Sequence, residues 1–523
     1  MKSILMNFVL ILAFFFVSGT NNAQTSPYQK SAINHLKKNL EYIASDKLEG
    51  RGIATRGIEL ASEFISQQLK IYNVQPFGDN GTYFQSFPIL ETNVDSETKL
   101  KVFYNDNNAK TFLIGEELYL STIVIPSNNY SGIKSDIVFA GYGLSSSENN
   151  YDDYSDIDVK GKIVFVMLGI PSYLAETAFL EGYGRMYGGV KYKITNAEKH
   201  GATGIILIPS GWIQKHWQFM VKQATSPEFT LINDDVENKS DEGSIPAVYI
   251  SEEVVRELLK DEKYSYNEIQ KLANDDEILP IFNLSKKVVL DYKIINLVKT
   301  AKNVIGLIEG TDEKLKNEFV VLSAHYDHEG IINDEIYNGA DDDGSGTVAI
   351  LEAARRIAQD KTNKRSVLIT FHTGEEEGLY GSQYLTSHSK YITDVIADIN
   401  IDMVGRGSTD SIYSIGSNKL STELHDLVEK TNDETVKFCF NYEFDDPADP
   451  NRYYYRSDHY NYAKHNIPIV FFYDHMTEDY HKPTDDVDKI NFEKIEKIST
   501  LITELSHRIA NLDHRLIIDK TDQ

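Results

Sequence analysis

The sequence predicts an α/β fold with a mainly parallel central sheet flanked by helices and a β-rich domain inserted into it. After residue 300, apolar strand-like runs alternate with helical segments, which is typical of βαβ units. Between residues 121 and 290, short β-rich runs predominate instead. A chain of 523 residues is also long enough to form two or three domains with separate cores.

The composition indicates a globular protein and excludes several kinds of partner. The hydrophobic share is 41% and the charged share 25%, which are ordinary values for a folded chain. With 52 Lys and Arg against 79 Asp and Glu, the net charge is −27, so we expect no nucleic-acid partner and little attraction to anionic membranes. The single cysteine, Cys439, excludes an intrachain disulfide and a cysteine-based zinc site. Any metal must therefore be held by histidine and carboxylate side chains.

The N-terminus has the pattern of a secretory signal peptide. Lys2 precedes an apolar run at residues 8–17, and small and polar residues follow up to Ala23. This run is shorter than the stretch that spans about 30 Å of hydrocarbon, which makes a stable membrane anchor the weaker alternative. We predict a signal peptide at residues 1–23, with cleavage after Ala23 or Gly19, and a secreted or periplasmic protein.

The next two segments differ in texture. Residues 24–120 are predicted to form the N-terminal part of the main domain, because apolar residues recur there at helical spacing, namely Leu60, Phe64, Ile65 and Leu69. Residues 121–290 are predicted to form the insert. Its strand-like runs are residues 136–144, 161–168, 204–208 and 245–250, and one helix is predicted to end at Gly201.

Residues 291–523 are predicted to complete the main domain and to carry its functional site. The strand-like runs are residues 319–323, 366–371, 397–403 and 468–472, with a helical segment at 347–359. In open parallel sheets, ligands bind beyond the carboxyl ends of the strands. Functional residues are therefore expected at or just after the end of each run.

Histidine and carboxylate residues lie at or after the ends of all four predicted strands. In chain order they are His325 and Asp327, the triplet Asp341, Asp342 and Asp343 before the helix, Glu375 to Glu377, Asp402, and His481 after Tyr480. Imidazole and carboxylate groups are zinc ligands, and there are more of them than one tetrahedral ion needs. The surplus suggests two ions, about 3.5 to 4 Å apart, that share a bridging carboxylate.

Each motif has an ordinary alternative when it is taken alone. A histidine after a strand is often structural, the aspartate triplet could complement a helix N-terminus, and the glutamates could form a solvated turn. Together, however, these alternatives would crowd like charges at one edge of the sheet, at a cost that a cation relieves. The HExxH, GxSxG and GxxxxGK[ST] motifs of other hydrolases and of phosphate loops are absent.

These residues resemble the co-catalytic di-zinc aminopeptidases, a family with glutamate carboxypeptidase and glutaminyl cyclase relatives. The matching motifs are SDKLEGRG, HYDH, GADDDGSG, GEEEG, NIDMVG and YHKPTDD. The insert resembles a protease-associated domain through its GYG, DVKGKIV and NAEKHGATGIIL runs. The resemblance thus implies a zinc-peptidase (phosphorylase/hydrolase-like) fold with an inserted protease-associated domain.

The resemblance also implies a role for each candidate residue. It implies two Zn²⁺ per chain, held by His325 and Asp402 on one ion, by Glu376 and His481 on the other, and by Asp342 as the bridge. Glu375 would be the general base, Asp327 would orient His325, and Tyr480 would donate to the developing oxyanion, with simple packing as its alternative. In the family the peptide bond after the bridging aspartate is often cis, which would place a cis bond before Asp343.

The implied function is an exported di-zinc exopeptidase acting on peptide substrates, and above all an aminopeptidase that releases N-terminal residues. A carboxypeptidase or dipeptidase of the same fold would need a basic residue aimed at a carboxylate, and the sequence does not place Arg452 or Arg456 for that task. A glutaminyl cyclase is disfavoured because those relatives are associated with a single zinc, whereas all five ligand positions are filled here. A non-catalytic receptor or binding module is disfavoured by the same complete ligand set. The oligomeric state stays open.

Overall fold

The computed structural model describes residues 27–120, 130–147, 150–172, 174, 189–224, 226–233, 245–446 and 449–521. The predicted signal peptide at residues 1–23 lies outside the described residues. Within the described ranges, no helix combines the length and the apolar character needed to cross a membrane.

The first of two large sheets carries the strands predicted after residue 300. Among the described residues it has ten strands, in the order β12-β2-β15-β19-β16-β20-β23-β21-β22, with β1 paired to β15. Their bounds are β1 (Gln75–Pro76), β2 (Phe84–Val94), β12 (Glu228–Leu231), β15 (Ile294–Ile308), β16 (Phe319–His325), β19 (Ser366–His372), β20 (Val395–Ile401), β21 (Ser411–Ile415), β22 (Cys439–Asn441) and β23 (Ile469–Tyr473).

The parallel part of this sheet is confined to its centre. The neighbours β19, β16, β20 and β23 run parallel to one another, and these are the four strands predicted from the sequence. The flanking pairs β12–β2, β2–β15, β15–β19 and β21–β23 are antiparallel, and only β22 adds a further parallel pair at the edge. The α/β fold is thus confirmed, with a mixed sheet around a parallel core.

Helices cover both faces of the first sheet. Every residue of β16 is buried, and its side chains alternate between the two sides: Val320 and Leu322 belong to one core cluster, Phe319 and Val321 to another. The first cluster is closed by α1 (Pro27–Ile43), α2 (Arg56–Ile71), α11 (Gly344–Asp360), α13 (Thr422–Glu434) and α15 (Phe492–Ala510), and the second by α12 (Tyr380–His388) and α14 (His459–Ala463).

The second large sheet builds the inserted lobe. Its order is β4-β3-β14-β7-β10-β11-β13-β5, with β6 paired to β14. The strands are β3 (Lys99–Asn105), β4 (Asn108–Leu113), β5 (Leu118–Leu120), β6 (Tyr130–Ser131), β7 (Ser135–Ala140), β10 (Ile163–Met167), β11 (Gly204–Ile208), β13 (Ala247–Ile250) and β14 (Ile281–Tyr292). Because β3 pairs with β14, this sheet begins before the predicted boundary at residue 121.

The inserted lobe also carries helices on both faces of its sheet. Helices α9 (Glu252–Leu259) and α10 (Tyr266–Asn274) pack into one core cluster, and α5 (Val190–Lys199) and α7 (Trp217–Ala224) pack into another, with α6 (Gly211–Lys215) just before α7. Two short hairpins complete the described strands, β8 (Ser145–Ser146) with β9 (Tyr151–Asp152), and β17 (Gly330–Ile332) with β18 (Glu335–Tyr337).

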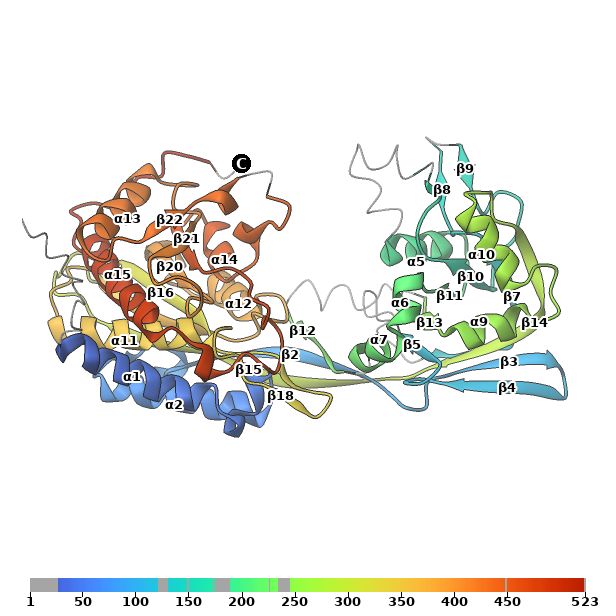
Figure 1. The fold of residues 1–523 in the computed structure, drawn as a ribbon, viewed down its shortest axis with the longest axis horizontal. Coiled ribbons are helices and arrows are strands. Elements are labelled where there is room, and N and C mark those ends of the chain that lie inside the picture. Colours follow the sequence, from blue (N-terminus) through green and yellow to red (C-terminus); the bar gives the residue numbers. More distant parts are fainter. Residues whose placement is uncertain are drawn as a thin grey trace, which may run out of the picture.

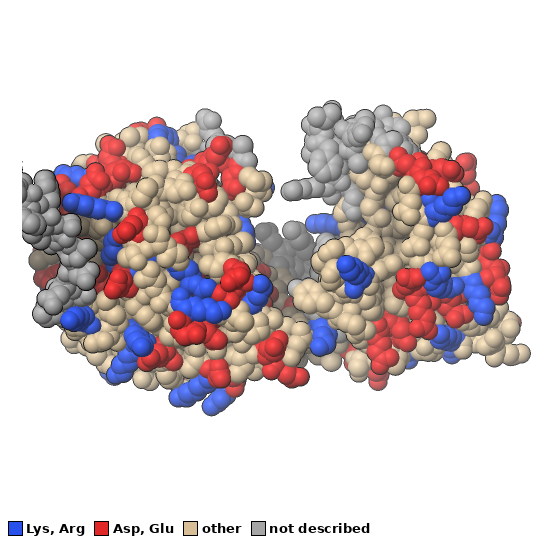
Figure 2. Space-filling view, viewed as in Figure 1, with Lys and Arg blue, Asp and Glu red and all other residues tan. Residues whose placement is uncertain are grey.

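A long ribbon joins the two lobes. Strands β2 and β15 pair along their length, from Phe84 opposite Val304 to Val94 opposite Ile294. Figure 1 shows them running from the lobe of the first sheet to the insert. Strand β12 comes from the insert in sequence but pairs with β2 in the first sheet. Figure 2 shows acidic and basic side chains interspersed over the visible face of both lobes.

Candidate metal centre

The predicted ligands converge at the carboxyl edge of the parallel strands. His325 is the last residue of β16, Asp402 follows β20 directly, and Glu376 lies in the loop after β19. Asp342 lies just before α11, and His481 lies in the loop after β23. Since adjacent parallel strands end at the same edge, residues far apart in the sequence meet there.

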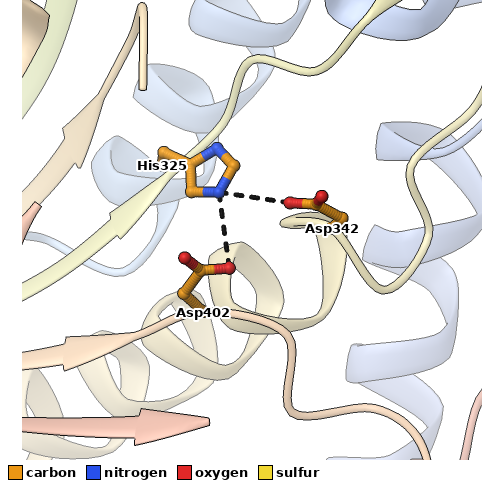
Figure 3. Close-up of side chains that lie close together, drawn as sticks. All are labelled: His325, Asp342 and Asp402. Carbon is orange, nitrogen blue, oxygen red and sulfur yellow. Dashed lines mark ion pairs between the residues drawn. The ribbon is translucent and has the colours of Figure 1, made fainter. Parts of the chain in front are cut away.

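Asp342 lies between two groups of predicted ligands. Its Oδ1 is 3.3 Å from Nε2 of His325, and its Oδ2 is 3.2 Å from Nε2 of His481. The first histidine also faces Asp402, with Nε2 to Oδ1 at 3.4 Å, and Figure 3 shows these three side chains pointing toward one another. The second histidine faces Glu376, with Nε2 to Oε2 at 3.1 Å. The two oxygens of the Asp342 carboxylate therefore face two separate histidine–carboxylate pairs.

The neighbours of Asp342 in the aspartate triplet accept hydrogen bonds from backbone N–H groups. Asp343 is the N-cap of α11, where its Oδ1 accepts hydrogen bonds from the backbone N–H of Gly346 and of Met403. Asp341 accepts a hydrogen bond from the N–H of Gly405 at 2.7 Å. The triplet thus ties the loop before α11 to the segment after β20. The family-based expectation of a cis bond before Asp343 is wrong, because no described peptide bond is cis.

Glu375 and Tyr480 line one pocket together with the ligands. Its lining includes the carboxylates of Asp342, Glu376 and Asp402, and the side chains of Met403, Tyr453, Phe471, Tyr473 and Met476. Burial raises the pKa of Glu375, as do the charges of Asp402 and Glu376, while His325 opposes the shift. The ring of Tyr480 stacks on His481 with centroids 3.8 Å apart.

Asp327 lies beside His325, as the sequence predicts. Nδ1 of His325 is 3.2 Å from the backbone oxygen of Asp327 and 3.7 Å from its carboxylate. The other carboxylate oxygen accepts a hydrogen bond from the N–H of Glu376 at 3.4 Å. Asp327 therefore connects a ligand of the first group to a ligand of the second.

Sequence reasoning missed four residues that surround the ligands. His328 places Nδ1 at 2.8 Å from Oε1 of Glu376, and Glu329 places Oε1 at 2.7 Å from Nδ1 of His481. Asp485 accepts hydrogen bonds from the N–H groups of Asp341 and Asp342. His328 and Asp485 lie inside quoted motifs, so their proximity to the ligands was a usable signal. Glu329 had no signal beyond its position next to His328.

Arg51 is the fourth missed residue and is fully buried. Its guanidinium donates to the carbonyl oxygens of Tyr326, Ile43, Asn338 and Gly339, and at 3.3 Å to that of Asp342. Burial lowers the pKa of Arg51, and nearby carboxylates beginning with Asp342 oppose the shift. The positive charge thus lies directly behind the loop that carries Asp342.

The donor set fits divalent cations. Nε2 of His325, Nε2 of His481 and Oδ1 of Asp402 are buried atoms without a hydrogen-bond partner among the described residues. Three groups of potential ligands occur here: His325, Asp342 and Asp402; His328, Asp342 and Glu376; and Glu329, Glu376 and His481. Imidazole and carboxylate donors that converge in this way suit zinc, and buried polar atoms are otherwise paired in folded proteins.

This edge of the sheet, with its converging imidazole and carboxylate groups, is the candidate metal site. Residues 303–506 match peptidase family M28, and residues 122–258 match the PA domain. These two matches confirm the family resemblance and the resemblance of the insert to a protease-associated domain.

Individual relatives agree with this assignment. A probable leucine aminopeptidase of Arthroderma otae is 31% identical over 216 residues, which cover 39% of this chain and 57% of that protein. Leucine aminopeptidase 1 of Ajellomyces dermatitidis is 29% identical over 38% of this chain and 54% of its own length. The chain therefore spans little more than half the length of these curated relatives.

Solved structures show the same fold over almost the whole chain. An aminopeptidase from Aneurinibacillus sp. strain AM-1 is similar with a TM-score of 0.56 and 19% identity, over 94% of this chain and 98% of that one. A zinc aminopeptidase from Bacillus subtilis has a TM-score of 0.52 and 18% identity, over 91% and 94%. At these identities the likeness concerns the fold alone.

Proposed function

We propose that this protein is a zinc-dependent metallopeptidase that holds two Zn²⁺ per chain and hydrolyses peptide bonds as an aminopeptidase. The observation that carries the proposal is the bridging position of Asp342, whose two oxygens face His325 and His481 at 3.3 and 3.2 Å. The M28 match and the aminopeptidases among the relatives support it.

His325 and Asp402 would hold one ion, Glu376 and His481 the other, and Asp342 both. When bound, the ions would act as Lewis acids and lower the pKa of an attacking water toward about 7. Glu375 would take the proton from that water and pass it to the leaving amine. It lines the pocket beside the ligands and makes no ion pair among the described residues, so its carboxylate is available for this task.

Tyr480 would donate a hydrogen bond to the developing oxyanion. Its side chain lines the same pocket, and its ring is held against His481. Burial raises the pKa of Tyr480, with Asp342 as a further cause, so the hydroxyl keeps its proton at neutral pH and remains a donor. Asp327 would keep His325 in the orientation that presents Nε2 to the ion.

A second candidate function is supported by Arg456. It is the basic residue among those that line the pocket, and its guanidinium lies over the ring of Tyr453 at 5.1 Å. A cation at this place suits a free carboxylate, which favours a carboxypeptidase or dipeptidase. Arg452 instead lies over Tyr455, which is outside the pocket lining. The complete ligand set and Glu375 argue against a non-catalytic binding module.

We also propose that the protein is exported, to the periplasm or beyond the cell, because residues 1–23 have the pattern of a secretory signal peptide. Its substrates would be peptides.

The test is a substrate panel on the purified protein. It contains amino-acid p-nitroanilides, N-blocked copies of them, and peptides with blocked C-termini, each with and without a chelator. The aminopeptidase proposal predicts chelator-sensitive turnover that requires a free amine and tolerates a blocked C-terminus. A requirement for a free carboxylate would select the second function, and binding without turnover in the metal-replete protein would refute a catalytic role.

A further inference from the structure

We propose that Glu329 is a positioning residue for His481 and thereby sets the affinity of the second metal position. The inference rests on the proposed two-ion site. It starts from one contact: Oε1 of Glu329 lies 2.7 Å from Nδ1 of His481. On the other side of the ring, Nε2 faces Asp342 at 3.2 Å and Glu376 at 3.1 Å. The two nitrogens of one imidazole therefore have different partners.

This arrangement defines which nitrogen is free to bind an ion. If Glu329 accepts a hydrogen bond from Nδ1–H, then Nε2 carries the lone pair and presents it to Asp342 and Glu376. A carboxylate that orients a ligating histidine in this way also makes the imidazole a better donor. Glu329 belongs to one of the groups of potential ligands, but its contact is with Nδ1 and not with Nε2, the nitrogen that faces Asp342 and Glu376. We therefore assign it a role through His481.

His481 needs such support more than the other ligands do. Its side chain is 31% exposed, whereas those of His325, Asp342, Asp402 and Glu376 are at most 10% exposed. It lies in a loop and not at a strand end, with a positive φ of 50°. Its ring stacks on that of Tyr480 and meets that of His328 edge to face, with centroids 5.7 Å apart. A hydrogen-bonding carboxylate adds a directional constraint that these ring contacts lack.

Glu329 itself has a rigid base. It directly precedes the β17–β18 hairpin, whose Gly330 packs backbone to backbone against the N-terminal segment. Gly50 has a φ of +68°, and a Cβ at that position would lie 2.3 Å from the carbonyl oxygen of Gly330. The contact between these segments thus fixes the backbone from which Glu329 reaches His481.

The test is a zinc titration of the metal-free full chain against a chromophoric chelator, for wild type, E329A, E329Q and E335Q. Glu335 is an exposed acid on the same hairpin, so E335Q removes an equal charge without touching a ligand. We expect E329A to weaken one of the two ions by about 10- to 100-fold and to leave the other unchanged. E329Q should retain most of the affinity, because its amide oxygen still accepts from Nδ1–H.

Three results would overturn the proposal. If E329A binds both ions like wild type, Glu329 does not position His481. If E329Q loses as much affinity as E329A, Glu329 is itself a ligand. If E335Q weakens the binding of the same ion as E329A does, the loss of affinity comes from the removal of a negative charge and not from the contact with His481. A wild-type protein that binds no zinc would refute the proposed function itself. The three results above concern Glu329 alone and leave zinc binding by the wild type intact, so the failures of the two proposals are distinguishable.

Discussion

The role of a single side chain in this protein depends on the groups that it contacts. In the aspartate triplet, Asp341 and Asp343 accept hydrogen bonds from backbone N–H groups of the segment after β20. Of the three, only Asp342 faces the other predicted metal ligands. The residue types were readable from the sequence, as was their place before a helix. The different roles of the three aspartates could not be predicted, because they are set by backbone partners some 60 residues away in the sequence.

The role of Glu375 gives a first prediction. Glu375→Gln should lower kcat by about two to four decades, because the amide cannot accept the proton of the attacking water. Zinc stoichiometry should stay as in wild type, since Glu375 is not among the grouped ligands. Glu377→Gln in the same loop is the matched control, since that side chain is exposed and should leave kcat unchanged. Steady-state kinetics decide the matter, and wild-type activity in E375Q would refute the assignment.

Arg51 gives a second prediction at this scale. Arg51→Met should lower the free energy of unfolding by at least about 3 kcal/mol, because it leaves several buried carbonyl oxygens without a donor. Arg56→Met is the control: this arginine has a 71% exposed side chain and one ion pair to Glu49, so its loss should cost under about 1 kcal/mol. Urea unfolding of both variants measures the difference, and equal effects would contradict the role given to Arg51.

Whole elements were predictable where the local pattern is strong. The four central strands are continuous apolar runs, since both of their faces are buried, and that pattern is visible without any partner. The antiparallel strands β2 and β15 were not predicted. They pair across about 200 residues of sequence, and half-exposed strands of this kind leave no distinct local signal.

In the insert, a buried lysine makes helix α5 sensitive to pH. Nζ of Lys193 donates to the carbonyl oxygen of Gly169 at 2.8 Å, and burial lowers its pKa to about 7, although Asp153 opposes the shift. The ordinary value is 10.5, so between pH 7 and 10.5 the unfolded chain binds more protons than the folded one. The stability of the insert should therefore rise with pH in this window, by at most about 1.4 kcal/mol per pH unit.

Tryptophan fluorescence measures this effect, because both tryptophans, Trp212 and Trp217, lie in the insert. The unfolding midpoint should increase from pH 7 to 9 in wild type. It should rise less in Lys193→Met, whereas Lys191→Met, an exposed change on the same helix, should keep the wild-type slope. An identical slope in K193M and wild type would show that Lys193 titrates normally.

At the scale of the whole molecule, the site depends on contacts that span most of the chain. The N-terminal segment supplies Arg51, the first sheet supplies the ligands, and the insert adds β12 to that sheet beside the loop of Glu375. There the hydroxyl of Tyr380 donates to the carbonyl oxygen of Phe229 at 2.9 Å. The ligand types followed from sequence chemistry and family motifs. The surrounding contacts of Arg51 and Glu329 did not, because backbone acceptors and hairpin geometry have no residue signature.

The central claim is that one carboxylate bridges two divalent cations. Anomalous diffraction at the zinc absorption edge, on crystals of the zinc-loaded full chain, tests it most directly. The account predicts two peaks about 3.5 to 4 Å apart, with the carboxylate of Asp342 between them, His325 and Asp402 at one and Glu376 and His481 at the other. A single peak, or two peaks of which one does not contact Asp342, would contradict it.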